Sequence, residues 1–258
     1  MTLEICVDDI AGLDAAVQGG VDRLELCAAL ALGGLTPAPS LIAAARDAPI
    51  PTHLLARPRE GGFRYSAREA AMIAADIAAA ADAGLAGVVI GASRPDRTLD
   101  ADLLAALVAH ARALGETRGA PLSLTLHRAI DLCPDLPGAL DVAIALGFDR
   151  VLTSGGEPRA IDGLAMLRTL HHRAAGRIVI LAGSGIDAGN VAPILDAGIV
   201  EVHASCGAPV SPPSHDDADD GAARERRFGF TSSAQRRTDT TRVRDLKAAV
   251  DRLQIQAA

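Results

Sequence analysis

Short apolar runs alternate with longer segments of helical periodicity along most of the chain. The short runs predict eight strands, at residues 3–7, 21–27, 50–56, 87–90, 121–127, 149–153, 177–182 and 199–204. The longer segments predict a helix after each strand, at residues 9–18, 38–47, 67–83, 100–114, 135–146, 160–174, 187–197 and 240–254. Strands that alternate with helices indicate parallel pairing through right-handed crossovers. Eight such units predict a single-domain α/β fold, a (β/α)8 barrel of the TIM type.

The domain layout follows from one interruption in this pattern. Residues 1–206 are predicted to form the barrel core, and residues 240–258 a C-terminal helix that completes the barrel. Residues 207–239 are rich in proline, acidic residues and arginine, so they predict a flexible loop that packs no core. Its arginines would either fold over an anionic ligand or form a solvated charged surface. An open doubly wound sheet is the alternative fold, but no GxGxxG motif follows the first strand.

Composition and charge narrow the classes of function. Apolar residues make up 49% of the 258 residues and aromatic residues only 2%, so aliphatic side chains must build the core. The net charge of −7 argues against nucleic acid as a partner, because phosphate binding needs a basic surface. No apolar run approaches the roughly 20 residues that span a bilayer, and the N-terminus lacks a signal-like pattern. We therefore predict a soluble cytoplasmic protein that does not bind a membrane.

Lysine and cysteine exclude further chemistries. Lys247 is the only lysine and lies in the predicted terminal helix. A Schiff-base mechanism needs a lysine amine inside the site, so Schiff-base aldolases and lysine-bound pyridoxal phosphate are largely excluded, and no organic cofactor is expected. The cysteines Cys6, Cys27, Cys133 and Cys206 contain no CxxC pair, which disfavours a zinc finger.

Polar side chains occupy alternate positions in five of the predicted strands. Because alternate residues of a strand point to opposite faces, an aliphatic face toward the helices turns these polar groups into the barrel. The inward set comprises Glu4, Cys6, Arg23, Glu25, Cys27, His53, Arg57, Ser123, Thr125, His127, Glu201, His203 and Ser205. Branched aliphatic residues normally fill a barrel interior. The polar set therefore predicts a structural ion-pair network at the lower positions and a functional site at the C-terminal mouth.

Three loops at this mouth favour an anion site. Arg57 and Arg59 accompany a glycine pair in residues 57–63, and glycine-rich loops follow two later strands at residues 153–156 and 183–186. Exposed amides at a helix N-terminus bind anions, and barrels often hold phosphate after strands 7 and 8. Tight turns are the alternative reason for such glycines. The predicted anion-binding residues are Arg57, Arg59, Arg128, Ser154, Gly183, Ser184, Gly185 and Ser205.

Several segments, in their order along the chain, resemble signatures of the CutC family. They lie at residues 4–8, 19–27, 33–37, 57–59, 63–66, 127–129, 152–155 and 201–203. The resemblance covers roughly residues 3–206. Ile130 stands where the family usually has an aromatic residue, and residues 226–229 match only in part. The resemblance implies a (β/α)8 barrel, a cytoplasmic location, assembly into a homo-oligomer, here expected to be a dimer, and an association with copper.

Two cysteines carry the copper hypothesis. Cys6 and Cys27 match the family cysteines proposed as copper(I) ligands, so the resemblance implies a copper(I) site there. Independently, alternation places both residues inward and at equivalent heights on neighbouring strands, which lie about 4.8 Å apart. Two thiolates at that spacing would suit a soft cation such as Cu(I). Burial as small apolar residues is the structural alternative.

The sequence thus supports two hypotheses and leaves open whether the protein is an enzyme. In the first, a copper-homeostasis protein binds Cu(I) through Cys6 and Cys27 without turnover. In the second, a barrel enzyme acts on a small anionic or phosphorylated molecule. Histidine suits acid–base chemistry near neutral pH, so His127 or His203 would transfer protons with help from Glu25.

Overall fold

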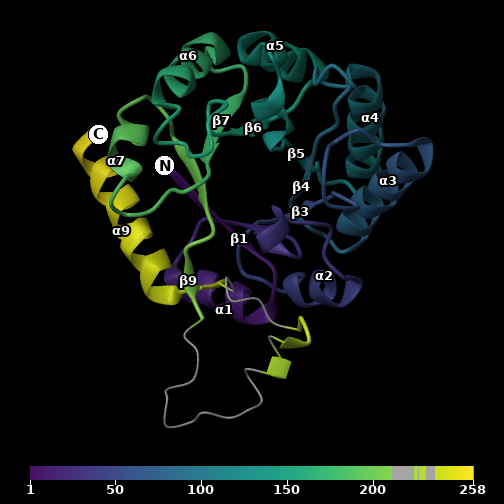
Figure 1. The fold of residues 1–258 in the computed structure, drawn as a ribbon. Coiled ribbons are helices and arrows are strands. Elements are labelled where there is room, and N and C mark those ends of the chain that lie inside the picture. The colour runs from purple at the N-terminus through teal and green to yellow at the C-terminus, as the bar shows by residue number, and fades with distance from the viewer. Residues whose placement is uncertain (211–223, 226, 231–235, 258) are drawn as a thin grey trace.

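Eight parallel strands close into a barrel in the computed structural model, which describes residues 1–210, 224–225, 227–230 and 236–257 (Figure 1). The strands are β1 (Thr2–Val7), β2 (Arg23–Leu26), β3 (Thr52–Leu55), β4 (Gly87–Ile90), β5 (Ser123–Leu126), β6 (Arg150–Thr153), β7 (Val179–Gly183) and β8 (Glu201–Ala204). The pairing of β8 with β1 runs from Thr2 opposite Glu201 to Ile5 opposite Ala204. This closure confirms the predicted (β/α)8 fold and rules out the open sheet.

Helices surround the barrel on its outside (Figure 1). They are α1 (Ile10–Gly19), α2 (Pro39–Ala45), α3 (Ala67–Asp82), α4 (Ala101–Thr117), α5 (Leu136–Leu146), α6 (Leu164–Ala174), α7 (Val191–Leu195) and α9 (Thr240–Ala257). Helix α9 packs against both α1 and α7. A Cβ on Gly19 would lie 2.2 Å from Val243 Cγ1, so glycine in α1 permits the close approach of α9.

The main core lies between the barrel and the helices. Leu3, Ile5, Leu24, Leu26 and Val202 are fully buried in it, at the alternate positions predicted to face the helices. Helix α9 adds Val243, Leu246 and Val250 to the same core. Polar residues occupy the opposite face of these strands. The aliphatic layer therefore stabilises the barrel from outside and leaves its interior available for charged groups.

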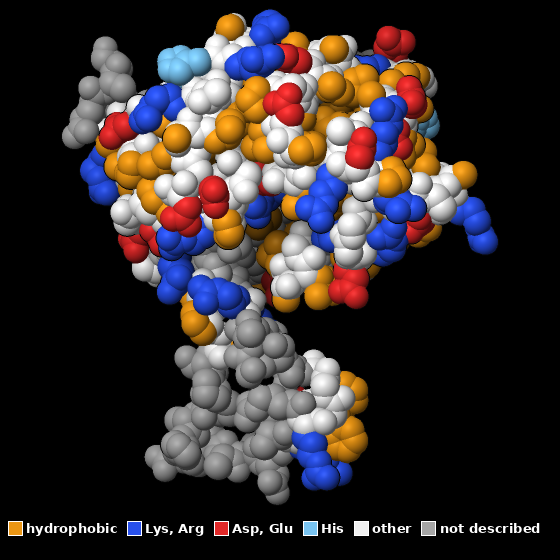
Figure 2. Space-filling model, turned by 45° about the horizontal axis from the view of Figure 1, so that its top comes forward, with side chains coloured by type: hydrophobic (Ala, Val, Ile, Leu, Met, Phe, Trp, Pro, Cys, Tyr) orange, Lys and Arg blue, Asp and Glu red, His pale blue; other side chains and the backbone are white. Residues whose placement is uncertain are grey.

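Two segments differ from their predicted form. The predicted helix at residues 187–197 shortens to the five residues of α7, because residues 184–190 form turns first. The predicted loop at 207–239 begins with β9 (Gly207–Pro209) and ends with β10 (Arg236–Thr238), and these strands pair antiparallel. Much of that loop, including Arg226, lies outside the described residues. Figure 2 shows exposed hydrophobic side chains beside basic ones in its described part. Phe228 and Phe230 are exposed there.

None of the helices in the described part of the chain is both long and apolar enough to cross a bilayer.

Candidate functional site

A cavity of about 300 Å³ lies at the C-terminal mouth of the barrel. It is lined by Cys6, Glu25, Leu30, Gly33, Leu55, Arg57, Phe63, His127, Arg128, Leu152, Ser184, Gly185, His203, Ala204 and Ser205. Nine of these residues were predicted as site residues from the sequence. The predicted residues Cys27, Arg59, Ser154 and Gly183 do not line the cavity.

Below the cavity, four charged side chains form a network across the barrel, in which Arg23, Glu4 and Glu201 are buried and Arg150 is partly buried. Arg23 bonds Glu4 through Nε, and its Nη2 lies 2.6 Å from Glu201 Oε2. Arg150 Nε lies 2.8 Å from the same Glu201 oxygen. Burial opposes ionisation of Glu4, but Arg23 and His203 outweigh it and hold the pKa of that carboxyl well below its usual range. The lower positions thus form the ion-pair network that the alternation predicted.

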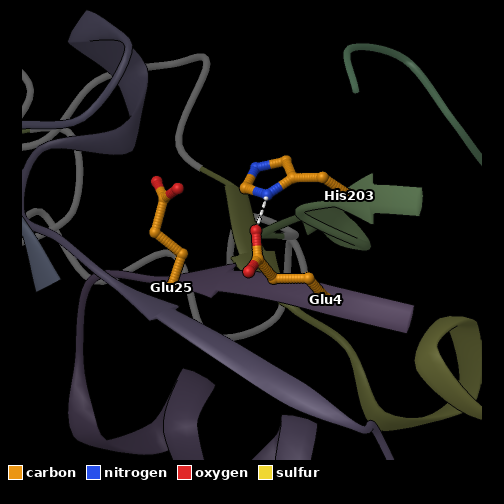
Figure 3. A group of neighbouring side chains, drawn as sticks. All are labelled: Glu4, Glu25 and His203. Atoms are coloured by element: carbon orange, nitrogen blue, oxygen red, sulfur yellow. Dashed lines mark hydrogen bonds and ion pairs between the residues drawn. The ribbon is translucent and has the colours of Figure 1, made fainter. Parts of the chain in front are cut away.

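His203 links this network to the cavity. Its Nδ1 lies 2.7 Å from Glu4 Oε1, across the β1–β8 closure (Figure 3). Burial disfavours the imidazolium, but the nearby Cys6 and Glu25 and the hydrogen bond to Glu4 raise the pKa of His203 well above its usual value. The surroundings of His203 therefore favour its protonated form.

Glu25 is a buried carboxyl with unused hydrogen-bonding capacity. It comes from β2 and lies beside His203 and Glu4 (Figure 3). Its side chain is buried, and among the described residues nothing bonds its Oε2. Burial is the largest cause that raises the pKa of Glu25, to about 7, with Glu4 acting in the same direction. A carboxyl with this pKa can both accept and release a proton near neutral pH.

His127 follows β5 and is held in one tautomer. Its Nδ1 accepts a hydrogen bond of 3.1 Å from the backbone amide of Ala129, so the ring proton resides on Nε2. The Phe63 ring packs on the imidazole with centroids 4.6 Å apart, and a Cβ on Gly91 would lie 2.3 Å from its Cε1. Burial, with Arg57 adding to it, lowers the pKa of His127 to about 3. His127 is therefore neutral, in contrast to His203.

Arg57 is a buried cation without a carboxylate partner in the described part of the chain. Its Nη1 donates to the carbonyl oxygens of Leu32 and Gly34 at 3.0 and 2.7 Å, and its Nη2 to that of Gly61 at 3.1 Å. Its Nε has no acceptor among the described residues. Carbonyl oxygens solvate the guanidinium but carry no net charge, so the positive charge of Arg57 remains uncompensated.

Arg59 has a different position. Its Nε bonds Glu69, and its other nitrogens donate to carbonyl oxygens of Glu60, Gly62 and Arg64. Glu69 also closes a capping box with Ser66 at the start of α3. Arg59 therefore braces the loop after β3 against α3 from outside the cavity.

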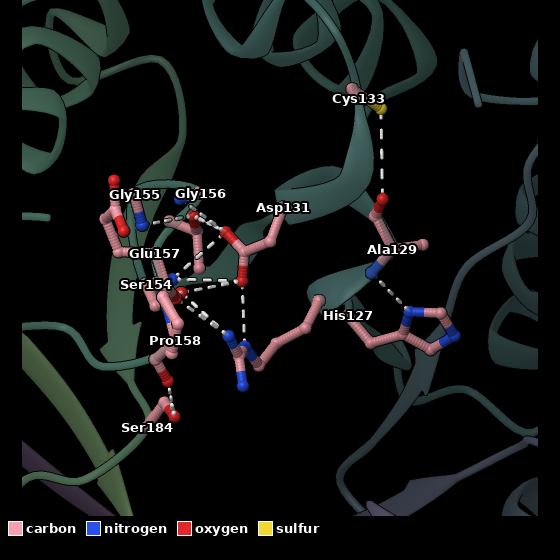
Figure 4. A network of polar contacts seen from close by, with 12 residues as sticks. His127, Ala129, Asp131, Cys133, Ser154, Gly155, Gly156, Glu157, Pro158 and Ser184 are labelled. Carbon is pink, nitrogen blue, oxygen red and sulfur yellow. Dashed lines mark hydrogen bonds and ion pairs between the residues drawn. The ribbon is translucent and has the colours of Figure 1, made fainter. Parts of the chain in front are cut away.

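The glycine-rich loop after β6 surrounds an internal carboxylate. Asp131 points into this loop (Figure 4) and accepts hydrogen bonds of 3.1 Å from the backbone amides of Ser154 and Gly156. Arg128 Nε lies 2.8 Å from Asp131 Oδ2, and Arg128 Nη2 donates to Ser154 Oγ at 2.7 Å. Asp131 thus occupies the amides that the sequence suggested for a ligand, and it balances the charge of Arg128. Nothing in the local sequence marked Asp131 for this role.

The loop after β7 contributes through its backbone. Ser184 and Gly185 line the cavity with positive φ angles of 92° and 67°. Ser184 Oγ donates to the Pro158 carbonyl at 2.6 Å, and Asn190 Nδ2 donates to the Gly185 carbonyl at 2.8 Å. Because α7 begins only at Val191, no helix N-terminus stands directly behind this loop. The prediction that exposed amides of a helix N-terminus lie at residues 183–186 is therefore wrong.

Cys6 and Cys27 are not at equivalent heights. Cys6 pairs with Glu25, and Cys27 lies two residues further along the chain beyond that partner. Cys6 lines the cavity, and its Sγ lies 3.6 Å from the Ala204 carbonyl. Cys27 is fully buried with Leu55 and Val89, and its Sγ lies 3.4 Å from the Val7 carbonyl. Burial is the main cause that raises the pKa of the Cys27 thiol.

One group of possible metal ligands occurs among the described residues. Glu4, Glu25 and His203 offer ligand atoms within 4.8 Å of one another. Both oxygens of Glu4 are already bonded, one to Arg23 and one to His203. Two carboxylates and an imidazole would suit a divalent cation better than Cu(I), which prefers thiolates.

The fold and the cavity define a (β/α)8 barrel with a candidate small-molecule site at its C-terminal mouth. The chain belongs to the CutC family, whose model matches residues 1–208. A CutC family protein from Sinorhizobium medicae is 46% identical over 256 residues, which cover 99% of this chain and 98% of the relative. One from Caulobacter vibrioides is 49% identical over 209 residues, which cover 81% and 82%.

A solved structure agrees with this assignment. The crystal structure of a CutC protein from Streptococcus agalactiae, named for copper homeostasis, has a TM-score of 0.72 and 28% sequence identity. The match covers 80% of this chain and 99% of that protein.

Proposed function

We propose that the barrel mouth binds a small anionic molecule and that the chain acts on it as an enzyme by proton transfer. The observation that carries this proposal is the buried, uncompensated charge of Arg57 in the cavity wall. Buried charges in proteins are normally paired, because an isolated buried charge is costly. A ligand anion would supply the missing partner.

The charges around Arg57 favour an anion over a cation. Arg23 and Arg150 balance Glu4 and Glu201 in the network below the cavity. Asp131 balances Arg128 in the wall. Arg57 and protonated His203 then remain against Glu25 alone, whose pKa of about 7 leaves it only partly ionised at neutral pH.

Glu25 and His203 supply the acid–base chemistry in this proposal. Catalytic acids and bases work best when their pKa lies near the working pH, which fits Glu25 as the proton acceptor. Protonated His203 would act as the proton donor or stabilise negative charge. His127, which is neutral and a weak base, would serve as a hydrogen-bond donor instead of a general base. Ser184, Gly185 and Ser205 would complete the ligand contacts.

Inorganic phosphate tests the anion site. We expect phosphate to bind wild-type protein in isothermal titration calorimetry and to bind Arg57→Met at least about tenfold more weakly, because the cation is removed. Arg57→Lys keeps the positive charge but loses the guanidinium hydrogen bonds to the carbonyl oxygens. It should therefore retain more phosphate affinity than Arg57→Met. Arg173→Met, on the outer surface, is the control. Equal phosphate affinity in all four proteins would refute the anion site.

A role in copper homeostasis is the second candidate function. CutC membership and the name of the Streptococcus agalactiae relative support it. In this candidate, Cys6 of β1 and Cys27, directly after β2, would bind Cu(I), with a cysteine rotamer change to bring their sulfurs onto one ion. Cytoplasmic location and homodimer formation stay predictions.

Cu(I) titration under reducing conditions tests this site. If the cysteines bind copper, Cys6→Ser with Cys27→Ser should lose one equivalent of tight Cu(I) binding. Affinity in the wild type should rise with pH, because thiols must lose protons to ligate and burial raises the pKa of Cys27. Cys133→Ser, at a buried cysteine elsewhere, is the matched control. Unchanged stoichiometry in the double variant would leave both cysteines as core residues.

A further inference from the structure

Three unsatisfied polar atoms belong to residues that line the same cavity, and Arg57 Nε, described above, is one of them. His127 Nε2 carries a proton and has no acceptor, and Glu25 Oε2 has no donor, within the ranges that the structure describes. Both residues are only 5% exposed. Buried polar atoms are nearly always hydrogen-bonded in native proteins, so an unpartnered pair at a cavity indicates groups that a ligand completes. Unpartnered atoms of His53, Tyr65 and Thr125 belong to residues outside the cavity lining.

The His127 donor is held in place from three sides. The Ala129 amide fixes its tautomer, the Phe63 ring lies against one side, and the absence of a side chain at Gly91 leaves room for the ring. A rigid neutral N–H donor in a buried site stabilises negative charge that develops on an oxygen atom. Such a donor contributes little where the ligand group is already a strong acid or a strong base.

The three unsatisfied features describe one ligand. Arg57 lacks an anion, His127 lacks an acceptor oxygen, and Glu25 lacks a proton-bearing partner. From this complementarity we infer that the substrate is a small anionic carbonyl compound, whose carbonyl oxygen accepts a hydrogen bond from His127 while Glu25 moves a proton at the neighbouring carbon. The inference rests on the proposed anion-binding function and specifies its substrate class. A cavity of about 300 Å³ suits a molecule of metabolite size.

The proton-transfer step balances without a cofactor. The Glu25 carboxylate takes a proton from the carbon next to the carbonyl, and the C–H electron pair becomes the second bond of a carbon–carbon double bond. The π pair of the carbonyl moves to its oxygen, which becomes an enolate stabilised by His127 Nε2–H. Glu25 then returns its proton to the same carbon. In a hydroxycarbonyl compound it returns it instead to the former carbonyl carbon, while the hydroxyl proton passes to the enolate oxygen and the hydroxyl-bearing carbon becomes the new carbonyl. The result is exchange or isomerisation, with no net oxidation.

Deuterium exchange measures this step directly. We would incubate dihydroxyacetone phosphate and pyruvate separately with the protein in D2O near neutral pD and follow loss of the C–H signals by proton NMR, against a buffer blank. Wild type should exchange at least one probe faster than buffer. Glu25→Gln should lower the enzymatic rate about 100-fold or more, as expected for loss of a general base. His127→Leu should lower it strongly, and His127→Gln, which keeps an N–H donor, should retain part of it.

The outcomes separate this inference from the function on which it rests. His172→Leu, at an exposed histidine on α6, is the matched control and should exchange like wild type. Phosphate binding without exchange of either probe would overturn the carbonyl inference and leave the anion site standing. Exchange that survives His127→Leu, in a variant with unchanged circular dichroism, would overturn the role of His127. Absence of both phosphate binding and exchange would overturn both proposals.

Discussion

Arg23→Met should destabilise the folded protein by about 3–5 kcal/mol at neutral pH, the cost expected when one partner of a buried ion pair is removed. The variant leaves Glu4, which is fully buried, without its guanidinium partner, and Glu201 with Arg150 alone. Methionine keeps much of the side-chain volume, so lost charge rather than a cavity should dominate. Urea unfolding, with the midpoint and slope fitted together, measures the loss.

The pH dependence identifies the cause of this loss. In wild type the lowered pKa of Glu4 contributes stability above the unfolded-state value of 4.5, and that contribution disappears as the pH falls. The difference between wild type and Arg23→Met should therefore shrink in acid. Arg173→Met removes an exposed ion pair with Asp141, so it should lower the free energy of unfolding far less than Arg23→Met. A loss for Arg23→Met as small as this control would show that the network contributes little.

Wild-type protein should lose about 3 kcal/mol of folding stability between pH 4.5 and 7 through Glu25, and Glu25→Gln should abolish this loss. The figure is the shift of the Glu25 pKa from 4.5 to about 7 expressed as free energy. Across this window the folded state keeps a proton that the unfolded state has released. Wild-type stability therefore falls as the pH rises through the window and is level above it, as far as Glu25 is concerned. Glutamine cannot ionise, so the free energy of unfolding of the variant should depend less on pH. Relative to wild type, the variant should be most stable at about pH 8, where its free energy of unfolding should approach or exceed the wild-type value.

Chemical denaturation at several pH values measures this profile. Glu116→Gln, at an exposed position of α4, should follow the wild-type profile and is the matched control. If the free energies of unfolding of wild type and Glu25→Gln changed in parallel with pH, Glu25 would ionise normally. The acid–base role proposed for Glu25 would then lose its basis. The two variants together test the lower, structural layer of the barrel and the upper, functional layer separately.

The periodicity of the strands was enough to predict which of their side chains point into the barrel. Because side chains alternate between the two faces of a strand, the positions of Glu4, Glu25 and His203 within their strands were enough to predict that all three point inward. The repeated strand–helix order predicted the closed barrel, and parallel closure gathers the C-terminal ends of all strands at one mouth. These features depend on local sequence, so local patterns were sufficient to predict them.

The partners of these residues depend on contacts between segments far apart in the sequence. The register between β1 and β2 offset Cys6 from Cys27, and no pattern within either strand contains that register. Asp131, from the segment after β5, accepts hydrogen bonds from backbone amides of the loop after β6. That glycine-rich loop therefore binds an internal carboxylate.

Burial decided the chemistry that composition left open. His127 and His203 are the same residue type on inward-facing strand ends, yet the pKa of one is lowered and that of the other is raised. The difference arises because His203 lies near Cys6, Glu25 and Glu4, whereas His127 meets an amide, an aromatic ring and the cation of Arg57. Sequence alone determined which side chains enter the barrel. The tertiary structure decided their charge, because a pKa depends on solvent exclusion and on neighbours that only folding brings together.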